Sequence, residues 1–425
     1  MKIINGIFKL GGIFFLSCFF SVSFAQKYQT KIFVPDILTL QVHLAGDELQ
    51  DPIIRMGSDN QIQISFDQMS HTLQFYSYSI ELCNADWTPS SLLPIEYLEG
   101  FNDNRIDEST MSFNTTFDYM HYSFMLPNEN IRFLLSGNYV VKIYETDYPD
   151  KILMTACFSI DENLLGIRGR VTGSTLMGVN TKFQQLNFEI DCSRQPITDP
   201  KRDLKILVQQ NGRIDNQVFD VIKPTYILPT SLVYEDNRNL IFEGGNEFYQ
   251  IDFSHIRNFL GRIERISFFR PYYHVETMPP VGDEFSDYQF MLDVNGRFKT
   301  HGQDIWSDAE IDYSVVHFVY PREEPWLDGS VYVAGYFNYN LLDGRNKMKY
   351  NFDRKQYELS VVLKNGGYNY QYLFLPAGQT EASSIKVAGS HWQTENDYKI
   401  YIYYCPYVGR HDRLIGVQTI NSVNR

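Results

Sequence analysis

The sequence predicts an all-β protein made of three tandem immunoglobulin-like β-sandwich domains. Apolar and polar residues alternate with period two along most of the chain, as in 61–66 and 139–144, which is typical of half-buried strands. Glycine, asparagine, aspartate and proline interrupt these segments at spacings of about ten residues, as in sandwich folds. Aromatic residues make up 15% of the chain, and such side chains favour pleated, half-buried surfaces.

The N-terminus has the features of a secretory signal peptide. Lysines flank the start of an almost wholly apolar run over 10–22, and Ser23-Phe24-Ala25 supplies small residues where a signal peptidase reads the chain. We therefore expect residues 1–25 to be removed and the mature chain to begin at Gln26. An uncleaved membrane anchor is the weaker alternative, because the run is shorter than the ~20 residues that span a bilayer.

Alternation breaks down at two polar segments, 161–163 and 300–310, which we interpret as joints between domains. Domains of the resulting size suit β-sandwiches. The three expected domains are the N-terminal sandwich at 26–161, a second sandwich at 164–298 and a C-terminal sandwich at 311–425.

Local signals predict the smaller elements. Asn211-Gly212 and Asn295-Gly296 are typical of tight turns. Pro89 and Pro94 limit a helix within 90–98 to a turn or two.

The remaining cysteines of the mature chain are scattered singly, so we expect buried thiols rather than a disulfide framework. A bridge between Cys83 and Cys157 is the alternative that the spacing leaves open. The four cysteines are Cys83, Cys157, Cys192 and Cys405.

The net charge of the chain is −14, and loss of the two lysines of the signal peptide makes it more negative. This sign argues against nucleic acid and anionic membrane surfaces as partners, since both attract lysine and arginine patches. Beyond the signal peptide no segment is long and apolar enough to span a bilayer. We expect no direct membrane insertion.

The chain lacks the short motifs of catalysis. G-x-S-x-G and H-E-x-x-H are absent, and the nine histidines never fall at i, i+2 or i, i+4. Asn102-Asp103-Asn104 and Asp293-Val294-Asn295-Gly296 match only fragments of calcium loops, and Asx turns explain both. Carboxylates from distant strands can pair for glycoside cleavage, but most of the 51 acidic residues are expected to be solvated. We predict no catalytic residue, cofactor or metal.

Several longer segments together are similar to the plug protein family of the type IX secretion system. The resemblance runs in one order over nearly all of the mature chain. It is carried by residues 51–57, 83–90, 96–101, 126–130, 136–139, 211–216, 242–248, 293–298, 368–372 and 391–398.

The resemblance implies a non-enzymatic periplasmic protein that occludes the periplasmic opening of a giant outer-membrane β-barrel translocon, which exports folded proteins including adhesins of gliding motility. The partner would be the barrel subunit, with this chain as a monomer in a hetero-complex peripheral to the outer membrane. The family supplies no catalytic residues. We predict Trp87, Tyr97 and Phe101, on a proline-bounded elbow, as partner contacts; the alternative for Trp87 is burial beneath that elbow.

The C-terminal segment has a second resemblance, to early-set sandwich domains that precede or bind α-glucans. It is carried by 330–338 and 367–374. Sugar binding in those domains uses a tryptophan and a lysine at positions that Asn340 and Gln371 occupy here. The resemblance therefore implies a retained fold and a lost sugar platform. A glycan-binding or adhesive accessory protein of the cell envelope is the alternative function.

Overall fold

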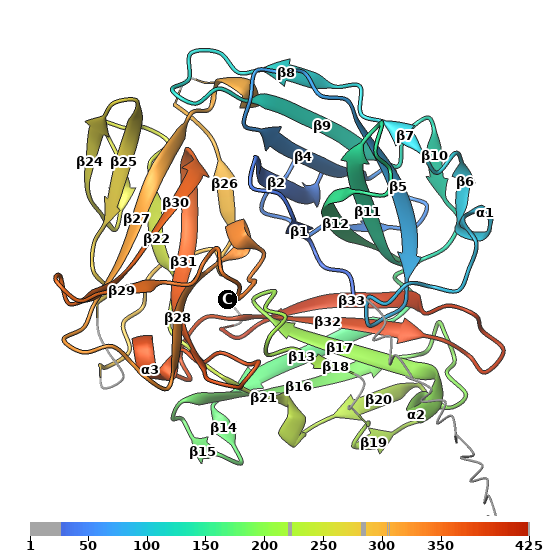
Figure 1. Cartoon of the computed structure of the whole chain (residues 1–425). Helices are drawn as coiled ribbons and strands as arrows, with labels where there is room; N and C mark the ends of the chain where they lie inside the picture. The colour runs from blue at the N-terminus through green and yellow to red at the C-terminus, as the bar shows by residue number, and fades with distance from the viewer. Residues whose placement is uncertain (1–26, 220–222, 282–285, 304, 306, 424–425) are drawn as a thin grey trace, which may run out of the picture.

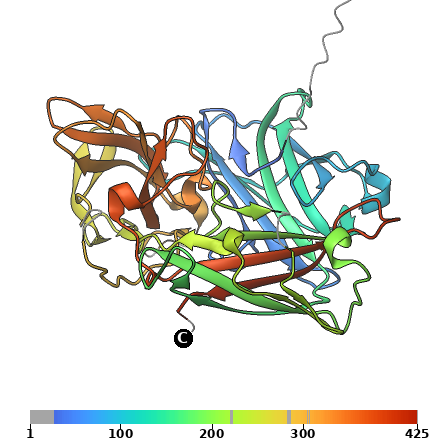
Figure 2. The same cartoon turned by 90° about the horizontal axis from the view of Figure 1, so that it is seen from below.

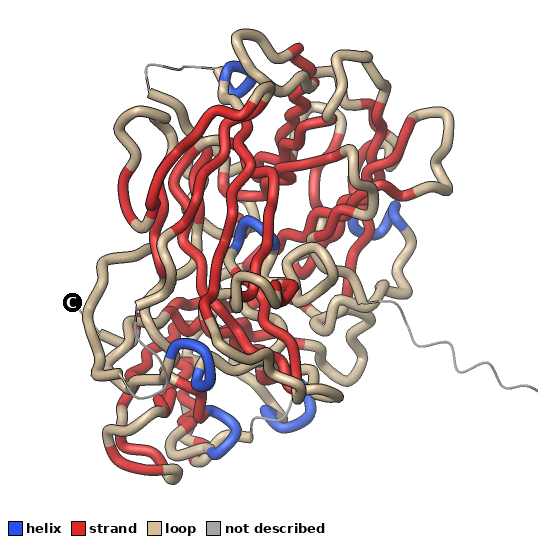
Figure 3. The backbone as a smooth tube through the Cα atoms, turned by 60° about the vertical axis from the view of Figure 1, so that its left-hand side comes forward, coloured by secondary structure: helices blue, strands red, loops and turns tan. Residues whose placement is uncertain are grey.

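The computed structural model describes residues 27–219, 223–281, 286–303, 305 and 307–423. The expected cleavage before Gln26 lies outside these residues. Strands and loops form nearly all of the described chain, and the helices are single turns (Figure 3). The all-β prediction is confirmed. No helix in the described part of the chain is long and apolar enough to cross a membrane.

The first sandwich contains the N-terminal strands. They are β1 (Lys31–Ile32), β2 (Ile37–Leu44), β3 (Ile53–Arg55), β4 (Ile62–Gln68), β5 (Tyr76–Cys83), β6 (Leu98–Gly100), β7 (Asn104–Arg105), β8 (Ser109–Met111), β9 (Met120–Leu126), β10 (Ile131–Phe133), β11 (Gly137–Glu145) and β12 (Ile152–Asp161). One sheet has the order β1-β12-β11-β5-β7 with β3 beside β12, and the facing sheet has the order β2-β4-β9-β8 (Figure 1). Helix α1 (Pro94–Tyr97) lies within the predicted segment 90–98.

The predicted alternation fills the core of this sandwich. Ile64 and Phe66 of β4 are fully buried, and Tyr139 of β11 stacks on Phe158 of β12 with ring centroids 5.5 Å apart. Burying a large apolar side chain contributes roughly 1.5–3 kcal/mol. The period-two pattern therefore marks the core-facing residues correctly.

The second sandwich combines strands from the middle and the end of the chain. They are β13 (Gly166–Thr172), β14 (Ser174–Thr175), β15 (Gly178–Val179), β16 (Phe183–Asp191), β17 (Leu204–Gln210), β18 (Val218–Phe219), β19 (Tyr226–Ile227), β20 (Ser231–Tyr234), β21 (Ile241–Glu243), β32 (Asp397–Tyr404) and β33 (Arg413–Asn421). One sheet has the order β13-β16-β20-β19 with β21 beside β16, and the other has the order β18-β17-β32-β33. Two short elements, α2 (Pro200–Asp203) and η1 (Arg238–Leu240), connect its strands.

The third sandwich occupies the sequence between these two parts. Its strands are β22 (Tyr249–Asp252), β23 (Leu260–Gly261), β24 (Ile263–Phe269), β25 (Tyr272–Thr277), β26 (Phe298–Thr300), β27 (Tyr313–Pro321), β28 (Gly329–Ala334), β29 (Lys349–Asn351), β30 (Gln356–Lys364) and β31 (Gly366–Pro376). They form the sheets β23-β22-β31-β26, with β28 beside β31, and β24-β25-β27-β30-β29. The short elements η2 (Asp308–Glu310), η3 (Tyr336–Asn338) and α3 (Ile385–Ala388) belong to its loops.

The expected bounds at 164–298 and 311–425 were wrong, because strand pairing crosses them. β17 pairs with β32 along its whole length, β22 pairs with β31, and β25 pairs in parallel with β27. In Figure 1 the red strands β32 and β33 accordingly lie beside the green strand β17. The third sandwich is thus an insertion between β21 and β32, and the polar segment 300–310 is a connection inside it. Only the joint at 161–163 separates two sandwiches.

The two crossings between the second and third sandwiches lie against each other. The His391 amide donates to the Gly245 carbonyl, and Asn396 Nδ2 donates to the Gly244 carbonyl at 2.8 Å. A Cβ atom on Gly244 would collide with the carbonyl oxygen of His391, so the crossing requires glycine there. Both crossing segments belong to the sequences that carry the plug-family resemblance.

The interleaved topology predicts how fragments behave. Residues 311–425 expressed alone lack β17, β22 and β25, so β32, β31 and β27 each lose a neighbouring strand. The fragment should therefore be unfolded by circular dichroism. Residues 164–425 keep every pairing of the two sandwiches and should fold as the matched control. A cooperatively melting 311–425 fragment would contradict the insertion.

Glu247 at the crossing predicts a pH dependence. Burial, reinforced by Asp293 and Glu395, raises the pKa of this carboxyl to about 7. A pKa raised on folding gives stability that is present at low pH and lost as the pH rises through 7. Glu247→Gln should therefore stabilise the protein by ~1 kcal/mol at pH 8 and little at pH 5. Urea unfolding at both pH values measures the difference; an equal gain at both would refute the assignment.

Candidate functional site

A cavity of about 350 Å³ lies where the three sandwiches meet. Each sandwich contributes to its lining, which combines aromatic and aliphatic side chains with glutamines and with three cations and three carboxylates. The residues that define it are Asp51 and Trp87 from the first sandwich, Gly212 and Lys399 from the second, and Arg297 and Tyr336 from the third. Such a cavity is the usual form of a small-molecule site.

Asp51 connects the three sandwiches at the wall of this cavity. Its two carboxylate oxygens accept hydrogen bonds from Arg297 Nη1 and Nη2 at 3.2 and 3.0 Å, and Lys399 Nζ forms an ion pair with it. The Arg297 guanidinium also lies 4.8 Å from the centroid of the Tyr336 ring. One carboxylate of the first sandwich therefore binds one cation from each of the other two.

The electrostatics keep this cluster charged. Burial alone would raise the pKa of Asp51, but Lys399 and Arg297 outweigh it and lower that pKa to about 2. Burial lowers the pKa of Lys399, and its side chain is only 7% exposed. Removing the carboxylate would leave two cations together in a desolvated position.

Two tight turns place residues beside the cavity as the sequence predicted. Asn211 and Gly212 have φ of 49° and 65°, and Asn295 and Gly296 have φ of 51° and 84°. The second turn closes with a hydrogen bond from the Arg297 amide to the Val294 carbonyl. A Cβ atom on Gly212 would collide with the Tyr336 hydroxyl, so glycine allows the third sandwich to approach.

The backbone is strained at other residues of the lining. Trp87, Tyr339 and Asn340 have φ of 66°, 59° and 51°, and all three line the cavity. A left-handed conformation costs a non-glycine residue roughly 1–2 kcal/mol. Such strain persists only where the surrounding packing fixes the backbone.

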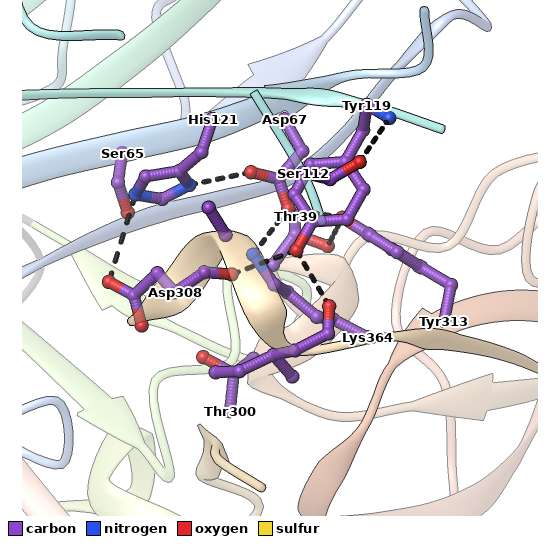
Figure 4. Close-up of polar contacts among 12 residues, drawn as sticks. Thr39, Ser65, Asp67, Ser112, Tyr119, His121, Thr300, Asp308, Tyr313 and Lys364 are labelled. Carbon is purple, nitrogen blue, oxygen red and sulfur yellow. Dashed lines mark hydrogen bonds and ion pairs between the residues drawn. The ribbon is translucent and has the colours of Figure 1, made fainter. Parts of the chain in front are cut away.

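A second buried ionic cluster joins the first and third sandwiches (Figure 4). Asp67 of β4 accepts hydrogen bonds from His121 Nδ1 at 2.6 Å, Lys364 Nζ at 2.7 Å and the Tyr313 hydroxyl at 2.6 Å. Burial opposes ionisation of Asp67, but Lys364 and His121 lower its pKa. The Tyr119 hydroxyl adds a hydrogen bond to the Ile311 carbonyl. Both oxygens of this carboxylate are therefore engaged, Oδ1 by His121 within the first sandwich and Oδ2 by Lys364 and Tyr313 across the interface.

The three residues predicted as partner contacts differ in how far they are exposed. Phe101 is 85% exposed. Tyr97 is buried in the first core and its hydroxyl donates to the Ile80 carbonyl at 3.3 Å, so its prediction as a surface contact is corrected. Trp87 is half-buried, lines the cavity and packs beside Cys83 and Cys157.

The elbow around Trp87 has an intramolecular partner that the sequence did not reveal. The Ala85 amide donates to Asp412 Oδ2 at 2.9 Å, and Asp412 pairs with Lys205 at 2.9 Å. Asn138 Oδ1 accepts a hydrogen bond from the Tyr403 hydroxyl at 3.0 Å. The elbow thus packs on the second sandwich.

All four described cysteines are free thiols, and the Cys83–Cys157 bridge is not formed. Cys83, Cys157 and Cys192 are buried, as predicted, and Cys405 is half-buried. Burial raises the pKa of each thiol, which disfavours the reactive thiolate.

The calcium-like segment 293–296 forms an Asx turn in which the Asn295 amide donates to Asp293 Oδ1 at 2.8 Å. Within the described residues no group of three or more histidine, cysteine or acidic side chains could hold a metal ion. Asn340 and Gln371, at the sugar-binding positions of early-set domains, are 4% and 8% exposed. Side chains so buried offer no platform for a glycan.

The ion cluster around Asp51 predicts a clear stability difference. Asp51→Asn leaves Arg297 and Lys399 without their anion and should destabilise the protein by ~3–5 kcal/mol. Lys399→Met keeps the bidentate Asp51–Arg297 pair and should change stability by ~1 kcal/mol or less. Urea unfolding measures both.

Lys355→Met is the matched control, because it removes an exposed lysine that pairs with exposed Glu323 and such pairs contribute little. An Asp51→Asn variant as stable as this control would show that Asp51 does not hold the sandwiches together.

Comparison with known proteins agrees with this architecture. No curated protein matches the chain. The structure is similar to the crystal structure of a hypothetical protein from Parabacteroides merdae ATCC 43184, with a TM-score of 0.91, 43% sequence identity, and coverage of 93% of this chain and 100% of that one. Residues 37–162, which make up most of the first sandwich, match the family model of the type 9 secretion system plug protein 1st domain. Residues 37–162 therefore form a type 9 secretion system plug protein 1st domain, and over nearly its whole length the chain is similar to the Parabacteroides merdae protein.

Proposed function

We propose that this chain is a non-enzymatic periplasmic plug that occludes the periplasmic opening of the giant outer-membrane barrel translocon of the type IX secretion system. The observation that carries the proposal is the match of the first sandwich to the plug protein domain. This domain associates the chain with a secretion-system complex of the cell envelope. Its partner is the barrel subunit, and it acts as a monomer within that complex.

The compact body supports occlusion as the mechanism. Figure 2 shows the three sandwiches packed side by side rather than strung out on linkers. Buried ionic contacts at Asp51 and Asp67 join them. A plug has to fill an opening without being deformed, and close-packed interiors resist compression.

An apolar surface on the first sandwich supplies a candidate contact with the barrel. Phe101, Ile95 and Leu93 are 85%, 81% and 65% exposed, beside a groove that Leu134 also lines. Ile95 lies on α1 and the others lie in the loops beside α1 and β6, at the right of Figure 1. Contiguous exposed apolar side chains are typical of interaction surfaces. Phe101 thus stays a predicted partner contact.

Deleting the chain should let solutes leak through the barrel while export largely continues. The reason is that a plug only blocks the path through the barrel and supplies no step of export. Uptake of a large hydrophilic antibiotic and secretion of a folded cargo are measured in the same cells. A deletion strain that stays impermeable while secretion stops would contradict occlusion.

Phe101→Asp should produce the same leak without loss of stability, since it places a charge in an apolar contact. Loss of a central aromatic anchor typically costs a complex ~2 kcal/mol or more, so less barrel should co-purify. Phe352→Asp is the matched control, at a phenylalanine that is 75% exposed on the third sandwich. Equal leakage in both variants would show that Phe101 does not contact the barrel.

A further inference from the structure

We propose that the central cavity binds a small organic anion, with its acidic group beside Lys399 and Arg297 and its aromatic or apolar body against Trp87. This ligand site goes beyond the plug function. It does not depend on contact with a barrel.

The charge balance of the cluster favours an anion. The lining carries three cations and three carboxylates, but Lys27 pairs with Asp86 and Glu48 pairs with Lys299, each at 3.7 Å. Lys399 and Arg297 share the single carboxylate of Asp51, so two cations face one anion in this cluster. The nearby Asp397 carboxylate accepts a hydrogen bond from Asn421 and acts to raise the pKa of both cations. Among the described residues, however, it lies within ion-pair distance of neither. A buried charge is most stable when paired. One negative charge on a ligand would complete the pairing.

The hydroxyl groups of the lining point to the same conclusion. Tyr336 and Tyr401 line the cavity and are half-buried. Neither hydroxyl has a hydrogen-bond partner among the residues that the structure describes, whereas Tyr339 donates to the Leu40 carbonyl at 2.9 Å. Burial raises the pKa of both Tyr336 and Tyr401, so both hydroxyls are available as donors. Two free donors beside two cations suit the oxygens of an acidic group.

The remaining walls suit an apolar body of limited size. Aromatic and aliphatic side chains face the cavity from all three sandwiches, including Tyr28, Trp87 and Phe298. The volume of about 350 Å³ is at the lower end of small-molecule sites, which span roughly 300–1,000 Å³. A neutral sugar would leave the second cation of the cluster without an anion. A dianion would bring one negative charge more than that cation can pair with.

Paired fluorescent probes test the proposal on the mature full-length protein. The aromatic anion 8-anilinonaphthalene-1-sulfonate should bind with a stoichiometry of one, at least tenfold more tightly than its uncharged analogue N-phenyl-1-naphthylamine. Lys399→Met should weaken binding of the anion about tenfold and leave the uncharged probe unchanged. Fluorescence titration and calorimetry report both, and thermal melting checks that the variant is folded.

Two further variants locate the site. Lys355→Met removes a lysine that is 59% exposed and should leave both affinities unchanged. Ile214→Trp, at a 36% exposed residue of the cavity rim, should block both probes while the protein melts normally. Equal affinity for the two probes would overturn the anion preference. Full binding of the anion to a folded Lys399→Met or Ile214→Trp variant would overturn the site. Neither result would bear on occlusion of the translocon.

Discussion

The arrangement of the molecule depends on one carboxylate, that of Asp51, which holds a cation from each of the other two sandwiches. Arg297 follows a tight turn of the third sandwich, and Lys399 lies on β32 of the second. This buried carboxylate fixes the relative positions of all three sandwiches. If either the Asp51–Arg297 or the Asp51–Lys399 contact were lost, a charge would remain unpaired in the interior. Asp67 forms a second buried ion pair between the first and third sandwiches, in which it accepts hydrogen bonds from Lys364 and from the Tyr313 hydroxyl.

The topology reinforces this attachment. The third sandwich is inserted between β21 and β32, so the last two strands of the chain complete the second sandwich. Two covalent crossings, rather than one linker, join these bodies, and Gly244 lets the crossings touch. A single linker would permit hinge motion, whereas two adjacent crossings and buried ion pairs restrain it. A restrained body of this kind is consistent with the proposed occlusion.

The exterior and the interior then carry separate roles. The exposed apolar residues around Phe101 lie on a loop and a single helical turn, where a partner can reach them. The cavity lies between the three sandwiches. Its cations, free hydroxyls and aromatic walls suit the small organic anion proposed above. The same junction therefore supports rigidity through Asp51 and recognition through the surplus cation.

The sequence by itself determined the fold class, the core-facing residues, the two Asn-Gly turns and the first joint, because alternation and turn chemistry are local properties. It also carried the plug-family resemblance. Only the tertiary structure decided which strands pair, since a period-two pattern shows which face of a strand is buried but not its neighbour. Tyr97 shows the same limit: its residue type suits a contact surface, but packing buries it. Asp51, Arg297 and Lys399 lie in or beside segments of the resemblance, yet they are hundreds of residues apart, and their meeting depends on the insertion that no local pattern records.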